Sequence, residues 1–182
     1  MRRGATGIVE KLEGSVADGL GPSDEAPRVD VVVFQLGNTR FALSSEFVEE
    51  LTHAFRFEVL PGAPKVVVGA VNLRGAVLPV FDLRSHLGLP AKATDVSDHF
   101  VVARAGRRRV VLHVDRVLEL RSIAVLPIAR ASHLQSKGGL VSGVAPIPDG
   151  TLFIYDLSGL LSEAEERALD RALEGRTGEV VE

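Results

Sequence analysis

The sequence predicts a mainly β protein, built from two small five-stranded β-barrels packed side by side and followed by a C-terminal helix. Short β-branched runs, broken by turn residues, recur from Val29 onward, which is typical of strands joined by hairpins. The order of these runs repeats once along the chain, which indicates an internal duplication. Small sheets leave unpaired edges unless they close on themselves, so closed barrels are favoured over open sheets.

The predicted strands fall into hairpins. Residues 29–36 (VDVVVFQL) and 41–44 (FALS) flank the turn GNTR, in which Gly37-Asn38 supplies the left-handed backbone of a tight turn. DHFVVAR and VVLHVDRVLEL repeat that arrangement around AGRRR, within 98–120. The other two hairpins join KVVVGAVNL to AVLPVFDL, and SGVAPI to TLFIYDL.

The two ends of the chain differ from this pattern. Residues 1–28 contain several Gly, Pro, Ser and acidic positions and are expected to form a flexible leader. A helix is predicted at 162–174, because Ser162 and Glu165 form a capping box and Gly175 supplies a stop. Apolar residues recur there at helical spacing, namely Leu161, Ala164, Ala168, Leu169, Ala172 and Leu173.

The duplication can be followed residue by residue. Without a gap, Gly69 aligns with Gly143 and Asp82 aligns with Asp156. The earlier hairpins also correspond, and the matched pairs there are Gly37 with Gly106, Leu43 with Leu112, Glu46 with Asp115, Val48 with Val117, and Glu50 with Glu119. We therefore expect one domain at 29–175, which contains two barrel subdomains at roughly 29–95 and 96–161 and the helix.

Composition limits the function classes. The 182 residues are 46% hydrophobic and 25% charged, which is ordinary for a globular protein. A formal net charge of -3 gives no global reason to expect a nucleic-acid or membrane partner. The chain has no cysteine, which excludes disulfides, thiolate metal sites and a cysteine nucleophile. No apolar run approaches the roughly 20 residues of a membrane-spanning helix, so a cytoplasmic protein is expected.

Several segments carry a resemblance to a known family. They are LPGAP at 60–64, VVVGAVNLRGAVLPVFDLRSHLGLP at 66–90, HVDRVLEL at 113–120 and VSGVAPIPDGTLFIYDLSGLL at 141–161. Together they resemble the CheW-type chemotaxis coupling proteins over roughly residues 29–173. The resemblance implies a non-enzymatic adaptor, without cofactor or metal, that couples a chemoreceptor's cytoplasmic helical tip to the regulatory domain of a CheA-type histidine kinase. His113 departs from the family pattern, which usually has a small or apolar residue there.

The resemblance also implies a partner-binding surface. Its candidate residues are Val48, Glu50, Gly69, Val71, Leu73, Arg74, Gly75 and Gly143. Because receptor tips are helices, a shallow apolar groove that accepts helical side chains is expected. A guanidinium at a hairpin tip can bind a carboxylate in a planar, bidentate contact, and we expect Arg74 to pair with Glu50 across the sheet.

Enzyme sites are not predicted. Asp82 and Asp156 are paired by the repeat, but each precedes a leucine at a strand end and is expected to cap the helical turn that follows. The five histidines, His53, His86, His99, His113 and His133, show no spacing typical of metal ligands. We therefore predict no catalytic residue and no metal or cofactor site.

Two alternative functions remain open. The first is an adaptor of the same kind that binds a receptor but no kinase, in a specialised motility or regulatory pathway. The second is a small β-barrel that binds nucleic acid through Arg107-Arg108-Arg109, since arginines on a hairpin can contact phosphates. Single-strand binders also use exposed aromatic residues for stacking, and this hairpin has none, so a solvated turn is favoured.

Overall fold

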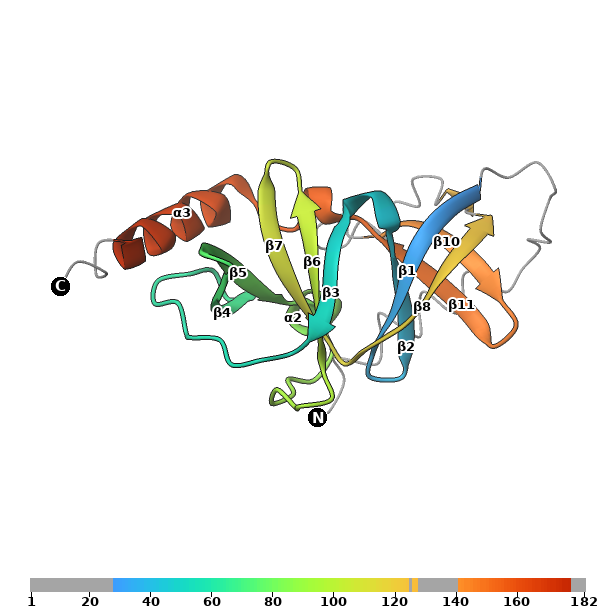
Figure 1. Ribbon diagram of the computed structural model, residues 1–182. Coiled ribbons are helices and arrows are strands. Elements are labelled where there is room, and N and C mark those ends of the chain that lie inside the picture. Colours follow the sequence, from blue (N-terminus) through green and yellow to red (C-terminus); the bar gives the residue numbers. More distant parts are fainter. Residues whose placement is uncertain (1–27, 125, 128–140, 178–182) are drawn as a thin grey trace, which may run out of the picture.

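Two curled β-sheets and a C-terminal helix make up the protein in this computed structural model, which describes residues 28–124, 126–127 and 141–177 (Figure 1). Sheet A contains β1 (Arg28–Leu36), β2 (Thr39–Ser44), β8 (Arg116–Ala124), β9 (Leu126–Pro127), β10 (Val141–Ile147) and β11 (Gly150–Tyr155). Sheet B contains β3 (Val48–His53), β4 (Val67–Leu73), β5 (Ala76–Asp82), β6 (His99–Ala105) and β7 (Arg108–Val114). The mainly β class is confirmed. The predicted leader lies outside the described residues, apart from Arg28.

The helical elements are short except at the C-terminus. They are η1 (Ser45–Phe47), α2 (Leu83–Leu87), η2 (Leu157–Gly159) and α3 (Glu163–Thr177). The capping box before α3 is confirmed, because Glu165 Oε2 accepts from the backbone N–H of Ser162 at 2.9 Å and Ser162 Oγ accepts from that of Glu165 at 3.4 Å. Gly175 does not end the helix as predicted, since backbone hydrogen bonding continues to Thr177.

The duplication is visible in the hairpins. The β1–β2 and β6–β7 turns both place a glycine in the left-handed region, with φ of 61° at Gly37 and 60° at Gly106. The β4–β5 ladder shifts register between Val67 and Gly69, and the β10–β11 ladder shifts between Val141 and Gly143. The two halves therefore repeat even their β-bulges.

The predicted subdomain boundary between 95 and 96 is wrong, because the repeats exchange strands. Sheet A has the order β8-β1-β2-β11-β10-β9, and sheet B has the order β3-β6-β7-β5-β4. Each sheet thus combines the first hairpin of one repeat with the later strands of the other. The exchange is reciprocal, since β1 pairs with β8 and β6 pairs with β3. The parallel contacts repeat in the same way, between β11 and β2 and between β5 and β7.

The predicted five-stranded barrels are found as curled sheets. Sheet B has five strands, and sheet A has a sixth, the two-residue β9 beside β10. Within the described residues neither sheet closes through a continuous ladder. In sheet B an isolated bridge joins Glu58, after edge strand β3, to Ala70 of edge strand β4, with hydrogen bonds of 3.0 and 2.7 Å. This bridge brings the two edges of sheet B together at one end.

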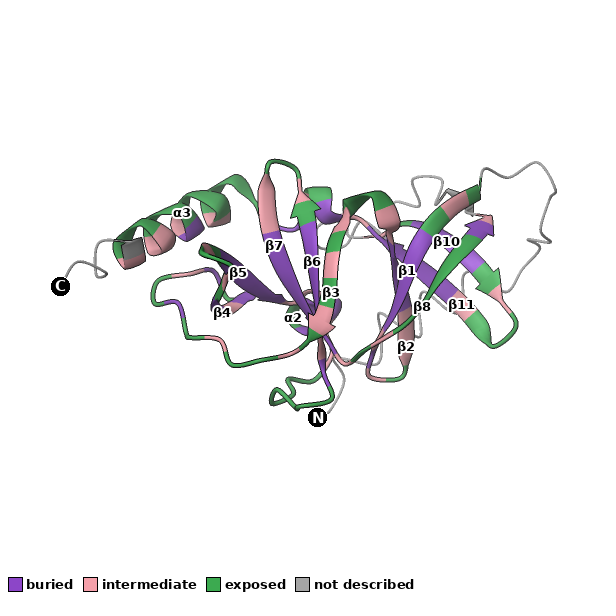
Figure 2. Ribbon diagram, viewed as in Figure 1, coloured by how far each residue is buried: buried purple, intermediate pink, exposed green. Residues whose placement is uncertain are grey.

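Three apolar clusters hold the sheets. One lies within sheet A around Val33, Leu152 and Ile154, and another lies within sheet B around Val71, Val80 and Phe100. The largest, here called the shared core, takes buried residues from both sheets, α2, η2 and α3, including Phe34, Phe41, Phe81, Leu83, Leu112, Phe153 and Leu169. Figure 2 shows buried residues on the strands of both sheets. Burial of so many large side chains from both sheets in one cluster couples the sheets into one folding unit.

Candidate partner-binding surface

The β4–β5 hairpin ends in a tight turn at the surface of sheet B. The backbone N–H of Gly75 donates to Asn72 Oδ1 at 2.9 Å, which closes the turn. Arg74 and Gly75 both have left-handed backbones, with φ of 52° and 86°. Positive φ is unusual for a residue with a long side chain, so the turn fixes the direction in which the Arg74 side chain leaves the hairpin. That side chain is 78% exposed.

Arg74 forms the predicted ion pair with Glu50. Nη2 of Arg74 lies 3.0 Å from Oε1 of Glu50. Glu50 lies in edge strand β3, and Arg74 lies in the turn that follows edge strand β4, so the pair connects the two edges of sheet B. Ion pairs this exposed contribute only about 0–1 kcal/mol to stability. The pair therefore orients an exposed guanidinium rather than stabilising the fold.

Gly69 is required by a close approach of two backbones. A Cβ atom at this position would lie 2.3 Å from the Glu58 carbonyl oxygen and 2.5 Å from Cδ2 of Phe57. Glu58 is the residue that bridges to Ala70 and joins the edges of sheet B. Gly69 thus acts at the candidate surface indirectly, because it permits the edge closure that positions β3 beside the β4–β5 hairpin.

Two of the predicted contact residues face inward. Val71 is 4% exposed and belongs to the cluster within sheet B. The expectation that Val71 contacts a partner directly is wrong, because its side chain is buried in the apolar cluster of sheet B. Leu73 is half-buried and packs against the same cluster. These two residues support the hairpin from inside.

Val48 lies on a different face, at the seam between the sheets. It is half-buried and packs against the shared core from β3, and Val117 packs against the same core from β8. Leu51 pairs with Val101 of the shared core, so it projects to that side, and it is 45% exposed. We call Val48, Leu51 and Val117 the seam strip. Val117 was not predicted, although its repeat match with Val48 was a signal that could have found it.

Gly143 does not join this surface through sheet B. It is buried in β10 of sheet A, at a bulge, where it pairs with Ile154 and Pro127. Its place in the hairpin is the one that Gly69 occupies in the other repeat. The structure therefore gathers Glu50, Arg74 and Gly75 at the hairpin tip and separates them by sheet from Gly143.

The arginines of the β6–β7 hairpin are largely paired with carboxylates. Arg104 and Arg109 both contact Glu49, at 2.9 and 2.6 Å, and Arg108 contacts Asp170 of α3. The Arg104 hydrogen bond, followed by that from Arg109, lowers the pKa of Glu49. Carboxylates already occupy these guanidinium groups, so the hairpin offers few free cations to phosphates. The structure gives the nucleic-acid alternative no support.

The paired aspartates have the capping role that was predicted. Asp82 Oδ1 accepts from the backbone N–H of Arg84 at 2.9 Å, and Asp156 Oδ1 accepts from that of Ser158 at 2.8 Å. Each starts the helical turn that follows its strand. Among the residues that the structure describes, no three His, Asp or Glu side chains converge as a metal site would require.

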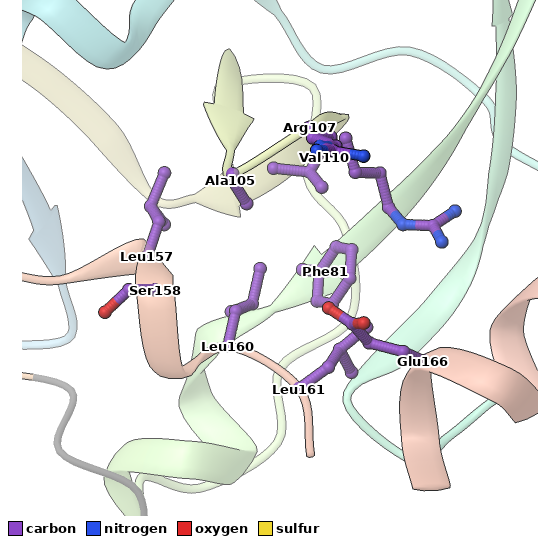
Figure 3. A pocket seen from close by; sticks show the side chains of 11 residues that line it. Phe81, Ala105, Arg107, Val110, Leu157, Ser158, Leu160, Leu161 and Glu166 are labelled. Atoms are coloured by element: carbon purple, nitrogen blue, oxygen red, sulfur yellow. The ribbon is translucent and has the colours of Figure 1, made fainter. Parts of the chain in front are cut away.

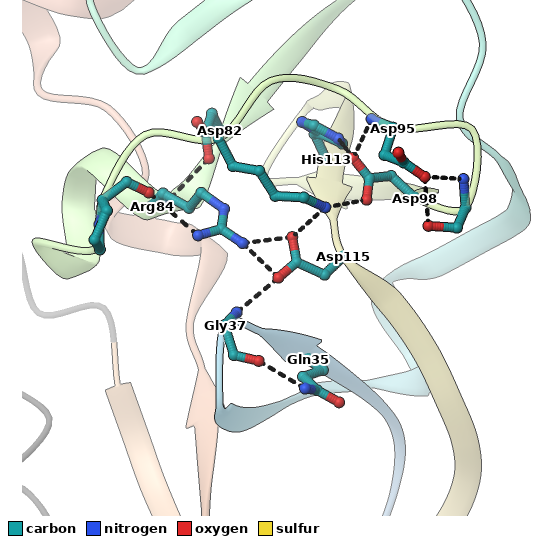
Figure 4. Close-up of polar contacts among 11 residues, drawn as sticks. Gln35, Gly37, Asp82, Arg84, Asp95, Asp98, His113 and Asp115 are labelled. Carbon is teal, nitrogen blue, oxygen red and sulfur yellow. Dashed lines mark hydrogen bonds and ion pairs between the residues drawn. The ribbon is translucent and has the colours of Figure 1, made fainter.

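A charged cluster links the two sheets (Figure 4). Asp115, between β7 and β8, accepts from the backbone N–H of Gly37 in the β1–β2 turn at 2.7 Å. It also forms an ion pair with the buried Arg84 of α2 and contacts Lys92 at 3.3 Å. We call these contacts of Asp115 the clasp. Burial opposes ionisation of Asp115, but the hydrogen bonds from Arg84 and Gly37 outweigh it and lower its pKa.

Asp98 extends this cluster into sheet B. It is fully buried, forms an ion pair with Lys92, and accepts from the backbone N–H of Asp95 at 2.8 Å. His113 Nε2 lies 2.9 Å from Asp98 Oδ2, which gives a polar partner to the histidine that departs from the family pattern. Burial opposes ionisation of Asp98, yet these hydrogen bonds lower its pKa overall. The cluster is a structural element that fixes the loop of residues 92–98.

Membrane insertion was not expected, and the described residues contain no helix that is long and apolar enough to cross a bilayer.

Comparison with known proteins identifies the family. The family model for the CheW-like domain matches residues 30–165. Protein FrzA of Myxococcus xanthus is 30% identical over 153 residues, which cover 80% of this chain and 92% of that protein. The probable chemotaxis protein CheW of Rhizobium etli is 29% identical over 143 residues, covering 76% and 91% of the two chains. The crystal structure of the scaffolding protein TtCheW from Thermoanaerobacter tengcongensis shares the fold, with a TM-score of 0.67 at 23% identity over 76% of this chain and 96% of that chain. The chain is therefore a member of the CheW-like family.

Proposed function

We propose that this protein is a non-enzymatic adaptor of a cytoplasmic chemosensory pathway, which couples the helical tip of a chemoreceptor to the regulatory domain of a CheA-type histidine kinase. Membership of the CheW-like family supports this role, and relatives of similar length carry the names of chemotaxis proteins. The observation that carries the proposal is the exposed Arg74, held by Glu50 at the tip of the β4–β5 hairpin.

The geometry supports protein recognition at two neighbouring features. Only Nη2 of Arg74 contacts Glu50, so within the described part of the chain the guanidinium keeps further hydrogen-bond donors for a partner. In the seam strip Val48 and Val117 are half-buried against the shared core and Leu51 is 45% exposed, so the strip offers apolar area to a partner helix. In this proposal the hairpin tip supplies orientation and charge, and the seam strip supplies apolar area. Val71, Leu73 and Gly69 keep the hairpin in place, and Gly143 shapes the corresponding hairpin of sheet A.

The direct test is binding of two separate fragments, a receptor-tip helical hairpin and a CheA-type regulatory domain, each titrated with the purified protein. The proposal predicts that both bind and that Arg74→Ala weakens at least one of them about tenfold, which corresponds to roughly 1.4 kcal/mol. Arg167→Ala is the matched control, because Arg167 is an exposed arginine of α3 whose nearest carboxylate is 3.8 Å away. Binding of the receptor fragment alone would favour the adaptor without a kinase partner, and binding of neither would contradict the proposal.

A further inference from the structure

An open pocket lies between the β6–β7 hairpin and the segment that leads into α3 (Figure 3). Its volume is about 580 Å³, within the range of sites that accept a ligand or a partner's side chains. The apolar lining is Phe81, Ala105, Val110, Leu157, Leu160 and Leu161. Phe81 and Val110 are fully buried members of the shared core, so part of the lining of the pocket belongs to that core.

The internal duplication explains why this pocket exists. The repeat matches Ala105 with Leu36, Val110 with Phe41, and Ser158 with Arg84, following the alignments of Gly106 with Gly37 and Asp156 with Asp82. At all three positions the pocket side has the smaller residue. On the other side Leu36, Phe41 and Arg84 are buried, and the Arg84 guanidinium is held in the clasp by Asp115. The pocket therefore lies where three buried positions of the other repeat are replaced by smaller residues.

The rim of the pocket is charged. Arg107 lies on the hairpin side and Glu166 lies on the helix side, as Figure 3 shows. Arg108 also lines the pocket, and its charge is paired with Asp170. Arg107 forms no ion pair with any residue in the described ranges, in contrast to Arg104, Arg108 and Arg109 of the same hairpin. Arg107 therefore offers a cation to a carboxylate of a partner on the hairpin side of the rim, whereas the Glu166 carboxylate lies on the helix side.

From these observations we infer that the pocket binds an amphipathic helix of a protein partner, which inserts one or two large apolar side chains and places a carboxylate against Arg107. The apolar side chains take the volume that Leu36 and Phe41 take in the other repeat. A helix suits the site because its apolar residues recur on one face with acidic residues beside them, one turn away. The inference rests on the proposed adaptor function, and it adds a second contact surface, formed by residues other than the hairpin tip and the seam strip.

The absence of cysteine allows a direct probe. Ser158→Cys places a single thiol at the pocket, where an environment-sensitive fluorophore can be attached. Asn38→Cys is the matched control, because Asn38 is the repeat counterpart of Arg107 and lies in the exposed β1–β2 turn. Each labelled protein is titrated separately with the receptor-tip fragment and with the kinase regulatory fragment. We expect a blue shift and a saturable intensity change with one fragment at Ser158→Cys and none at Asn38→Cys.

Filling the pocket tests the same inference without a label. Ala105→Leu combined with Ser158→Arg restores two of the three larger residues of the other repeat. The expected result is an unchanged or higher melting temperature and an affinity for the responding fragment that is at least about tenfold weaker. Arg107→Glu is expected to weaken the same fragment severalfold, with a loss that shrinks as salt rises, while Asn38→Glu has no effect.

The outcomes separate the two proposals. If both fragments bind the wild type, but the folded filled variant binds them equally well and the label does not respond, the pocket inference is overturned and the adaptor function stands. If neither fragment binds the wild type, the adaptor function fails and the inference that rests on it fails too. If the label at Ser158→Cys responds to an added second copy of this chain and to neither fragment, the pocket is a site of self-association. That result would overturn the partner helix as its occupant.

Discussion

The carboxylate of Asp115 accepts a hydrogen bond from the backbone N–H of Gly37 at 2.7 Å, although the two residues belong to different repeats. Gly37 lies in the turn between two strands of sheet A, whereas Asp115 follows the last residue of β7 in sheet B. The same carboxylate is paired with Arg84, so a single side chain connects sheet A, sheet B and α2. The relative position of the two sheets therefore depends on polar contacts as well as on the shared core.

The first prediction concerns this clasp. Asp115→Asn removes the charge that compensates the buried Arg84, so we expect the free energy of unfolding to fall by about 2 kcal/mol or more. Urea denaturation followed by circular dichroism measures the change. Asp149→Asn is the control, because Asp149 forms an exposed ion pair with Arg40 and its loss should cost less than about 1 kcal/mol. Equal effects of the two substitutions would contradict the role assigned to Asp115.

The second prediction concerns pH. The folded-state pKa values of Asp98 and Asp115 lie below the ordinary aspartate value of 3.8, so both carboxylates bind protons less readily in the folded than in the unfolded chain. Their contribution to stability is present above that value and is lost as the pH falls through the lower folded-state pKa values. The urea concentration at the midpoint of wild-type unfolding should therefore decrease as the pH is lowered below about 4.

Asp98→Asn provides the check on this pH dependence, because it removes one of the two titrating groups. The free energy of unfolding of Asp98→Asn should be lower at pH 7 and should change less between pH 5 and pH 3 than that of the wild type, since about 1.4 kcal/mol accompanies each unit of pKa shift. A variant whose acid dependence matches the wild type would show that Asp98 does not contribute to it.

The third prediction contrasts two glycines. Gly69→Ala places a methyl group 2.3 Å from the Glu58 carbonyl oxygen, so it must open the bridge that joins the edges of sheet B. We expect a loss of about 1–3 kcal/mol in stability, since the methyl group overpacks a site closed by backbone. Gly175→Ala meets no atom within 4 Å in α3 and should stabilise the protein by about 0.5–1 kcal/mol. Thermal melting tests both variants: the melting temperature should fall for Gly69→Ala and rise for Gly175→Ala.

Local sequence patterns predicted the individual hairpins well. The left-handed backbone predicted for Gly37-Asn38 is found at Gly37 and at its repeat match Gly106 but not at Asn38, and Asp82 and Asp156 cap the turns that follow their strands. These features depend on a few neighbouring residues, which is why they can be recognised from the chain alone. The Arg74–Glu50 pair was also predicted, on the strength of the family motif, and it is present at 3.0 Å.

The exchange of strands between the repeats could not be predicted in the same way. The residues of β1 do not indicate whether β3 or β8 will pair with it, because the two strands carry matching residues, Val48 with Val117 and Glu50 with Glu119. The charged cluster was missed for a related reason, since Arg84 and Asp115 are 31 residues apart and meet only after the exchange. The sequence shows that Ala105 and Val110 are smaller than their repeat counterparts. Only the structure shows that an open pocket lies beside them.

The central claim is that the Glu50–Arg74 pair orients a guanidinium for partner binding. Glu50→Arg and Arg74→Glu each place like charges together at the hairpin tip, whereas the double variant restores an opposite pair with its sign reversed. All three proteins should melt within a few degrees of the wild type, because the pair is exposed. The most direct measurement is the affinity of each variant for the receptor-tip and kinase fragments. The account predicts about a tenfold loss in each single variant and a substantial recovery in the double variant. A double variant that binds no better than either single one, while remaining folded, would contradict it.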